Sequence, residues 1–148
     1  MSDVFQGFSG EGTANNPYLV SNILELINMK SFPDSHFKQT RDIAMDNINA
    51  VDLPLFNYFN GVYDGSGHVL SNCNAFNEYA NGLFGYIGDN GIVKHLIIDN
   101  FNLYYNDEYG SMPIKKGFLA SDNMGIIEYV GVLRSNIQIF TGEVSIKV

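Results

Sequence analysis

Three aspartates precede glycines of recurring segments in this 148-residue chain, and carboxylates at such a spacing could do chemistry. They are Asp64, Asp89 and Asp122, which stand three, two and three residues before a glycine. If the segments stack, these carboxylates form an acidic ladder along one corner, and pairs of carboxylates at a defined separation cleave sugars. Aspartate before glycine is also the ordinary composition of a turn. We favour turns, and we predict that the chain is not an enzyme and has no catalytic residue.

The remaining residues with reactive side chains suggest structural roles. The three histidines are scattered, without neighbours at metal-ligand spacing: His36, His68 and His95. We therefore predict no metal site, and we expect His68 and His95 to face outward or to lie at corners. The single cysteine, Cys73, cannot form an intramolecular disulfide. It is expected to be a small buried hydrophobe in one column with Leu96 and Val130. Phosphate-loop, dinucleotide and nucleophile-elbow motifs do not occur, so no cofactor is expected.

One segment combines tyrosines with acids. Residues 102–116, NLYYNDEYGSMPIKK, hold three tyrosines around two acidic residues. Rigid aromatic side chains beside carboxylates suit burial against an arginine or lysine of a partner. The alternative is a surface loop whose tyrosines pack back on the protein. The predicted partner-binding residues are this group and three further aspartates: Tyr104, Tyr105, Asp107, Glu108, Tyr109, Asp64, Asp89 and Asp99.

The charge of the chain is negative and unevenly distributed. Sixteen acids against eight bases give a net charge of -8. Nine of the acids and one base, Lys94, fall between residues 42 and 114, so this window carries the whole excess. Such a field repels nucleic acid and anionic membranes and attracts basic protein surfaces. The alternative is that the acidity only keeps the protein soluble.

Size and composition predict one all-β domain spanning residues 1–148. The chain is long enough for one core and short for two. Its 45% hydrophobic and 16% charged residues, with many glycines, phenylalanines and tyrosines, are typical of turn-rich β proteins. The start has no basic, apolar signal-peptide pattern, and no stretch approaches the roughly 20 apolar residues of a membrane span. We therefore expect a cytoplasmic protein that does not bind membranes.

Internal repeats predict how the strands are arranged. The stretch Gly91–Ile98 matches Gly125–Val132 at an offset of 34, and Leu70–Ala75 matches Val93–Ile98 at an offset of 23. A period in the low twenties predicts a solenoid, here a short right-handed parallel β-helix. The alternative is an antiparallel sandwich with coincidental similarity. Because the offset lengthens from 23 to 34, an inserted loop is expected at residues 102–116.

The two ends of such a stack need cover. Residues 21–30, SNILELINMK, have helical apolar spacing with Ser21 or Asn22 as a possible N-cap, and they predict a helix that caps the N-terminal end. The last residues, GEVSIKV, alternate Val144, Ile146 and Val148 and predict a closing strand.

Several stretches together resemble a known family. The segments FQGFSGEGTANNPYLVSN, FNGVYDGSGHVLSN, GLFGYIGDNGIVKHLII and GFLASDNMGIIEYVGV are similar to GLUG-motif repeat proteins, a right-handed β-helix group with filamentous-haemagglutinin or adhesin-like members in bacterial surface proteins and phage-associated chains. The resemblance covers nearly the whole chain and implies the β-helix fold. It implies an adhesive or structural use and brings no catalytic residues with it. The chain departs from the family in its small size and in the absence of an export signal.

These features support three hypotheses of function. The first is a non-enzymatic acidic protein that docks on a basic surface of a partner protein, without binding nucleic acid itself. Regularly spaced carboxylates imitate the phosphates of a duplex, so an inhibitor of the anti-CRISPR or anti-restriction type, encoded by a phage or mobile element, would fit by blocking the channel of a nucleic-acid-handling complex. The alternative is a receptor- or glycan-binding module of a phage tail or bacterial adhesin, located on the virion or cell surface. The third is a polysaccharide-acting enzyme.

Overall fold

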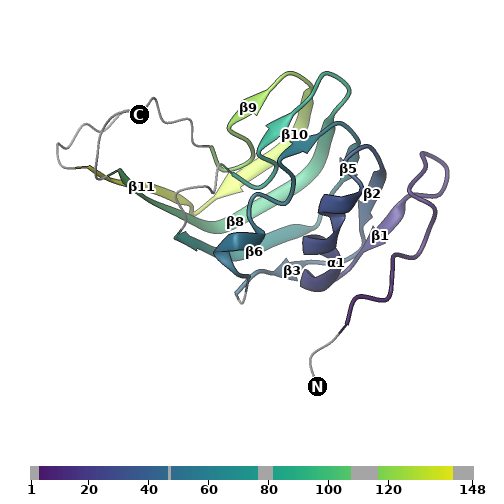
Figure 1. Cartoon of the computed structure of the whole chain (residues 1–148), viewed down its shortest axis with the longest axis horizontal. Coiled ribbons are helices and arrows are strands. Elements are labelled where there is room, and N and C mark those ends of the chain that lie inside the picture. The colour runs from purple at the N-terminus through teal and green to yellow at the C-terminus, as the bar shows by residue number, and fades with distance from the viewer. Residues whose placement is uncertain (1–3, 47, 77–81, 108–116, 142–148) are drawn as a thin grey trace.

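The computed structural model of the chain describes residues 4–46, 48–76, 82–107 and 117–141 (Figure 1). Three short helical segments occur: α1 Ile23–Asn28, η1 Met29–Ser31 and η2 Ala50–Asp52. The strands are β1 Tyr18–Val20, β2 His36–Gln39, β3 Ile43–Ala44, β4 Tyr58–Phe59, β5 Val62–Asp64, β6 Val69–Phe76, β7 Tyr86–Ile87, β8 Ile92–Asp107, β9 Asp122–Asn123, β10 Ile126–Leu133 and β11 Asn136–Thr141.

The strands form two sheets in which every described pair is parallel. The larger sheet has eight strands, in the order β1-β2-β5-β8-β6-β3, with β10 and β11 also paired to β8. The smaller sheet has the order β4-β7-β9. The long strand β8 therefore joins four other strands, and Figure 1 shows it crossing the middle of the molecule beside β6 and β10.

The predicted all-β right-handed parallel β-helix with one capping helix is wrong. The fold is mixed: helical segments accompany one eight-stranded and one three-stranded parallel sheet. The physical reason is that alternating apolar residues specify which side of a strand is buried, but they do not specify how strands are grouped into sheets. The antiparallel alternative is wrong as well for the described strands, since all of their pairs are parallel.

One of the two predicted alignments is confirmed and the other is wrong. The offset of 34 is the register of β10 on β8, which pairs Ile127 with Val93. The offset of 23 fails because Leu70 pairs with Ile98. Cys73 consequently lies in register with Phe101, outside the column of Leu96 predicted for it. Apolar residues alternate with a period of two along a strand, so several registers of two strands bring apolar residues together. A short sequence match therefore does not determine which register forms.

The predicted inserted loop at residues 102–116 is wrong in its first part. Residues 102–107 continue strand β8, with β6 on one side and β11 on the other. The amides of this region form a ladder, because the Asn102 amide donates to Asn74 at 3.0 Å and the Asn136 amide donates to Asn102 at 3.4 Å. Residues 108–116 lie outside the described residues.

The long strands bend at residues with left-handed backbone conformations. Asn72, Asn100 and Arg134 have φ values of 58°, 54° and 44°, and their neighbours in register place Asn72 of β6 and Arg134, which directly follows β10, opposite Asn100 of β8. Asparagine tolerates this conformation better than most residues do. His95 and Tyr129 form a second such pair, each with φ near 54°. Both histidine and tyrosine therefore lie at bends.

A helix does occur within residues 21–30, and it is shorter than predicted. Asn22 is the N-cap, since its side chain accepts a hydrogen bond from the Glu25 backbone N–H at 2.8 Å. The Glu25 carboxylate in turn accepts from the Asn22 side-chain amide at 3.0 Å and from the Ser21 backbone N–H at 2.8 Å, so Asn22 and Glu25 bond reciprocally at the helix start. Leu26 and Met29 are fully buried and pack into the core.

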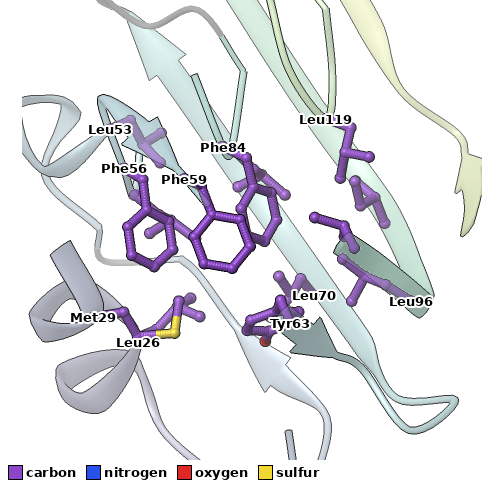
Figure 2. Close-up of a cluster of buried hydrophobic side chains, with 14 of the residues drawn as sticks. Leu26, Met29, Leu53, Phe56, Phe59, Tyr63, Leu70, Phe84, Leu96 and Leu119 are labelled. Atoms are coloured by element: carbon purple, nitrogen blue, oxygen red, sulfur yellow. The ribbon is translucent and has the colours of Figure 1, made fainter. Parts of the chain in front are cut away.

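A cluster of aromatic rings lies within the otherwise mostly aliphatic core (Figure 2). Phe59 lies at its centre, with ring centroids 4.4 Å from Phe56, 5.3 Å from Phe84 and 6.5 Å from Phe37. All four rings are buried. Phe37 belongs to the larger sheet and Phe59 to the smaller one, so the packing of these rings helps to hold the two sheets together.

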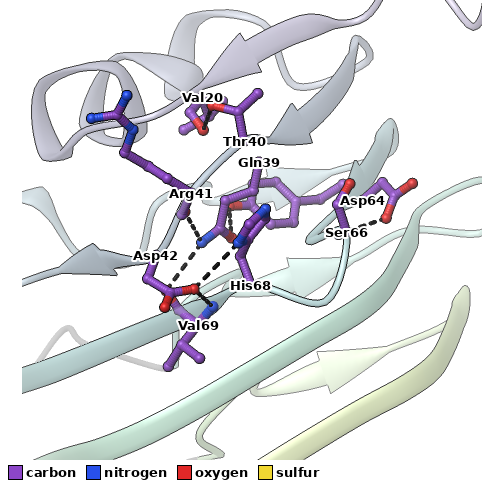
Figure 3. Close-up of polar contacts among 10 residues, drawn as sticks. Val20, Gln39, Thr40, Arg41, Asp42, Asp64, Ser66, His68 and Val69 are labelled. Carbon is purple, nitrogen blue, oxygen red and sulfur yellow. Dashed lines mark hydrogen bonds and ion pairs between the residues drawn. The ribbon is translucent and has the colours of Figure 1, made fainter.

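Among the described residues, one polar side chain, that of Gln39, is fully buried. The Gln39 amide nitrogen donates to the carbonyls of Arg41 at 2.9 Å and Val69 at 3.1 Å, and its oxygen accepts from the Tyr63 hydroxyl at 2.8 Å (Figure 3). Both N–H groups of the amide and one of the two lone pairs of its oxygen are thereby engaged. Burial, with a smaller effect of the Asp64 charge, raises the pKa of Tyr63 above its usual value, so this hydroxyl stays protonated.

Candidate binding surfaces

Asp99, a predicted partner-binding residue, forms an ion pair within the chain. Arg134 Nε donates to its carboxylate at 2.8 Å, and the second carboxylate oxygen contacts Arg134 Nη2. The hydrogen bond from the guanidinium, more than the charge alone, lowers the pKa of Asp99. Arg134 lies outside the acidic window of residues 42–114, so counting charges along the chain missed this partner.

Asp64 of β5 has a basic residue beside it on each of the two neighbouring strands. Strand register places it between Lys38 of β2 and Lys94 of β8. Its carboxylate accepts a hydrogen bond from the Ser66 backbone N–H at 2.8 Å and lies 3.3 Å from His95 Nδ1. A second contact of this kind joins His68 to Asp42 at 3.3 Å. Pairing of this sort reduces the negative field that the window of residues 42–114 presents to a partner.

The three aspartates expected to form a ladder lie apart in the fold. Asp64 belongs to the eight-stranded sheet and Asp122 to β9 of the three-stranded sheet. Asp89 is exposed in the turn that follows β7. The acidic ladder is therefore absent from these positions. In the described part of the chain, no group of three or more His, Cys, Asp or Glu side chains could hold a metal ion.

The predicted tyrosine-rich site is only partly described. Tyr104 lies on β8 and is half-buried. Tyr105 and Asp107 belong to the same strand, but their side chains lie outside the described part, as do Glu108 and Tyr109 entirely. The predicted partner-binding role of this segment stays a prediction.

A pair of stacked tyrosines, which the sequence predictions missed, lies on the three-stranded sheet. The rings of Tyr58 on β4 and Tyr86 on β7 are 5.3 Å apart between centroids, with an interplanar angle of 17°. Tyr58 is 49% exposed, while the residues that follow these tyrosines, Phe59 and Ile87, are fully buried. The sequence did contain a signal for this pair, because each tyrosine directly precedes a buried apolar residue in a glycine-rich segment. Successive residues of a strand point to opposite faces, so each tyrosine points away from the core.

Polar groups surround this pair. Register places Asp122 of β9 beside Tyr86, and the Asn60 side-chain oxygen accepts a hydrogen bond from the Asn90 backbone N–H at 3.0 Å. A Cβ added at Gly88 would lie 2.2 Å from the Tyr58 hydroxyl oxygen and 2.7 Å from the Asn60 side-chain oxygen. Only glycine therefore lets these two polar groups lie this close to the backbone at residue 88. We call Tyr58, Asn60, Tyr86 and Asp122 the tyrosine platform.

The chemistry of the tyrosine platform suits a ligand with one apolar face and many hydroxyl groups. Aromatic faces carry negative charge and attract weakly positive C–H groups. Amide and carboxylate oxygens accept hydrogen bonds from hydroxyls. Binding sites commonly combine aromatic walls with a few convergent polar groups. A sugar ring has both of the required features.

A second exposed aromatic contact lies elsewhere. Tyr129 on β10 is 79% exposed and stacks on His95, with ring centroids 5.3 Å apart and an interplanar angle of 29°. Both residues belong to the eight-stranded sheet. This contact provides a natural comparison for the tyrosine platform, because it has the same ring type and a similar separation on a different sheet.

Comparisons with known proteins gave two similar segments in much longer proteins. The chain is 32% identical over 142 residues to a putative Gly-rich membrane protein of Evansella cellulosilytica, with 88% of this chain and 16% of that protein covered. It is 28% identical over 120 residues to halomucin of Haloquadratum walsbyi, with 70% of this chain and 1% of halomucin covered. The chain thus spans a small part of each relative.

The other two comparisons gave no match: no family model and no solved structure corresponds to the chain. The names of the two relatives do not indicate a GLUG repeat, so that resemblance stays a prediction. Among the described residues, no helix has the length and apolarity needed to cross a membrane.

Proposed function

We propose that this chain is a non-enzymatic glycan-binding module of a surface protein and that it binds sugar through the tyrosine platform. The observation that carries the proposal is the stacked pair of the exposed Tyr58 and the half-buried Tyr86, bordered by the oxygens of Asn60 and Asp122. Each ring covers one face of the other, so the exposed ring of Tyr58 offers the apolar face, and the neighbouring oxygens offer hydrogen-bond acceptors.

The similar proteins add support for a location at the cell surface. One is named a membrane protein and the other halomucin, and both are far longer than the matching segment. A module repeated or embedded in a long surface protein is a common setting for recognition domains. The glycan-binding alternative from the sequence is therefore the one we advance first.

Glycan-array binding at low and high salt tests this function. Stacking and neutral hydrogen bonds are little screened by salt, so binding should persist at 1 M salt, where the screening length falls to about 3 Å. Replacing Tyr86 with alanine should weaken binding by roughly tenfold or more, as loss of an aromatic anchor does. The matched control is Tyr129→Ala, which removes an exposed stacked tyrosine from the other sheet and should leave binding unchanged.

A backbone variant separates loss of binding from loss of folding. Gly88→Ala should displace the Tyr58 hydroxyl and the Asn60 side chain, because the atoms nearest to the new Cβ belong to those two side chains. Binding should fall while the thermal unfolding midpoint changes little. Equal binding by the wild type, Tyr86→Ala and Gly88→Ala proteins, or no glycan binding by the wild type, would contradict the proposal.

Docking on a basic partner protein stays a second prediction. Some acids of the window remain exposed, among them Asp46 and Asp89. Asp64 and Asp99, however, contact or neighbour basic groups of the chain itself, so docking on a basic partner has less support than the charge count alone suggested. A pull-down from host lysate at low and high salt distinguishes it, since a basic partner held by this field should be lost as salt rises.

A further inference from the structure

Strand β10 leaves apolar residues uncovered at an edge of the larger sheet. Its residues Ile127, Val130 and Val132 are in register with Val93, Leu96 and Ile98 of β8, which are all fully buried. On β10 the same columns end in solvent: Ile127 is 40% and Val132 is 41% exposed. Within the described part of the chain, β10 pairs with β8 alone.

The edge is unusually apolar beyond these columns. Five of the eight residues of β10 are large hydrophobic residues that are exposed: Ile126, Ile127, Tyr129, Val132 and Leu133. An exposed edge strand presents unpaired backbone groups and pairs readily with another strand unless charges or bulges prevent it. The edge of β10 therefore has the properties of an interaction surface.

Charge indicates what kind of strand would pair there. Strand register aligns Lys38, Asp64, Lys94 and Glu128 on successive strands, so the sign of the charge alternates across the sheet. Opposite charges on neighbouring strands stabilise a sheet and like charges destabilise it. The column ends on the exposed Glu128 of β10. A strand added at this edge should place a basic residue opposite Glu128.

The chain itself supplies that residue. Arg134 directly follows β10, and its side chain is 78% exposed although it contacts Asp99. If two copies pair their β10 strands antiparallel about a two-fold axis at Gly131, Glu128 of each copy lies opposite Arg134 of the other. In the same register Val130 lies opposite Val132, which joins two apolar residues. Gly131 itself presents no side chain, and a Cβ built there meets nothing within 4 Å.

From this complementarity we propose that the edge of β10 binds a second copy of this chain, forming a two-fold symmetric dimer through antiparallel β10 strands. Such an interface is isologous, because each copy contributes the same patch and every contact occurs twice. The dimer covers Val130 and Val132 and completes the alternating charge column. It leaves the tyrosine platform, which belongs to the three-stranded sheet, outside the paired strand.

Sedimentation velocity of the full chain over a concentration series, with a charge swap, tests the dimer. Glu128→Lys and Arg134→Glu should each place like charges opposite one another and weaken dimerisation by roughly tenfold or more. The double variant restores opposite charges and should recover the dimer. Asp99→Asn is the matched control: it removes the contact of Arg134 within the chain and should leave the dimer intact. Circular dichroism checks that each variant is folded.

Three results would overturn the proposal. They are a wild-type protein that stays monomeric across the series, a dimer insensitive to both single changes, and single variants whose defect persists in the double variant. The second would place the interface elsewhere, and the third would exclude the register centred on Gly131.

Discussion

The two end strands β1 and β10 have the same kind of apolar column and differ in what covers it. At β1, Tyr18 ends the column that runs through Phe37, Tyr63 and Val93, and its half-buried ring packs against Phe8 and Phe32, with ring centroids 4.9 Å and 5.3 Å apart. At β10, Ile127 ends the same column at its other side and is 40% exposed, and Val132 on the same strand is 41% exposed. The comparison teaches that an apolar column contributes to stability at the end where other side chains cover it. At the end where nothing in the described chain covers it, the same column offers a surface for association.

The largest expected difference concerns an aromatic ring in the covered core. Phe59→Ala should lower the free energy of unfolding by about 3–5 kcal/mol, because the ring is fully buried and the change leaves a cavity. Val132→Ala on β10 should cost less than about 1 kcal/mol in the monomer, since that side chain is already partly exposed. Urea unfolding at low protein concentration measures both. Similar losses for the two variants would contradict the comparison.

A smaller effect is expected from the buried amide. Gln39→Leu should lower the free energy of unfolding by about 1–3 kcal/mol, because it leaves the Tyr63 hydroxyl and the Val69 carbonyl without their partner. Tyr63→Phe, which removes one hydrogen bond and keeps the ring, should cost less. If the double variant Gln39→Leu with Tyr63→Phe is no more stable than the sum of the single losses predicts, the two groups are not coupled.

The effect that is smallest at neutral pH concerns the protonation of Cys73. Burial raises the pKa of this thiol from 9.0 to about 12, so the folded protein holds the proton at pH values at which the unfolded chain releases it. Between pH 9 and 12 the unfolded state therefore binds fewer protons, and the free energy of unfolding falls as the pH rises. Cys73→Ala should reduce this slope in urea titrations. A thiol reagent should label native Cys73 at pH 8 far more slowly than it labels the unfolded protein.

The sequence predicted some of these features and missed others for identifiable reasons. The helix near Asn22, the register of β10 on β8 and the burial of Cys73 all follow from local patterns, namely a cap, a long match and a small apolar side chain. The second register failed because the match was short and its period of two permits several alignments. Sheet grouping failed because it depends on connections that no alternating pattern specifies.

The candidate surfaces were harder to predict than the strands. The Asp99–Arg134 pair joins residues far apart in the chain, so the local charge count could not reveal it. The stacking of Tyr58 on Tyr86 required the parallel register of β4 and β7, two strands of only two residues each. Tertiary register, more than residue type, brings these side chains together.

The most direct test of the central claim is an NMR titration of the chain with a sugar identified on the glycan array. The account predicts that the largest chemical-shift changes occur at Tyr58, Tyr86 and Gly88, with smaller ones at Asn60 and Asp122. Shifts confined to the eight-stranded sheet, for example at His95 and Tyr129, with none at the tyrosine platform, would contradict it.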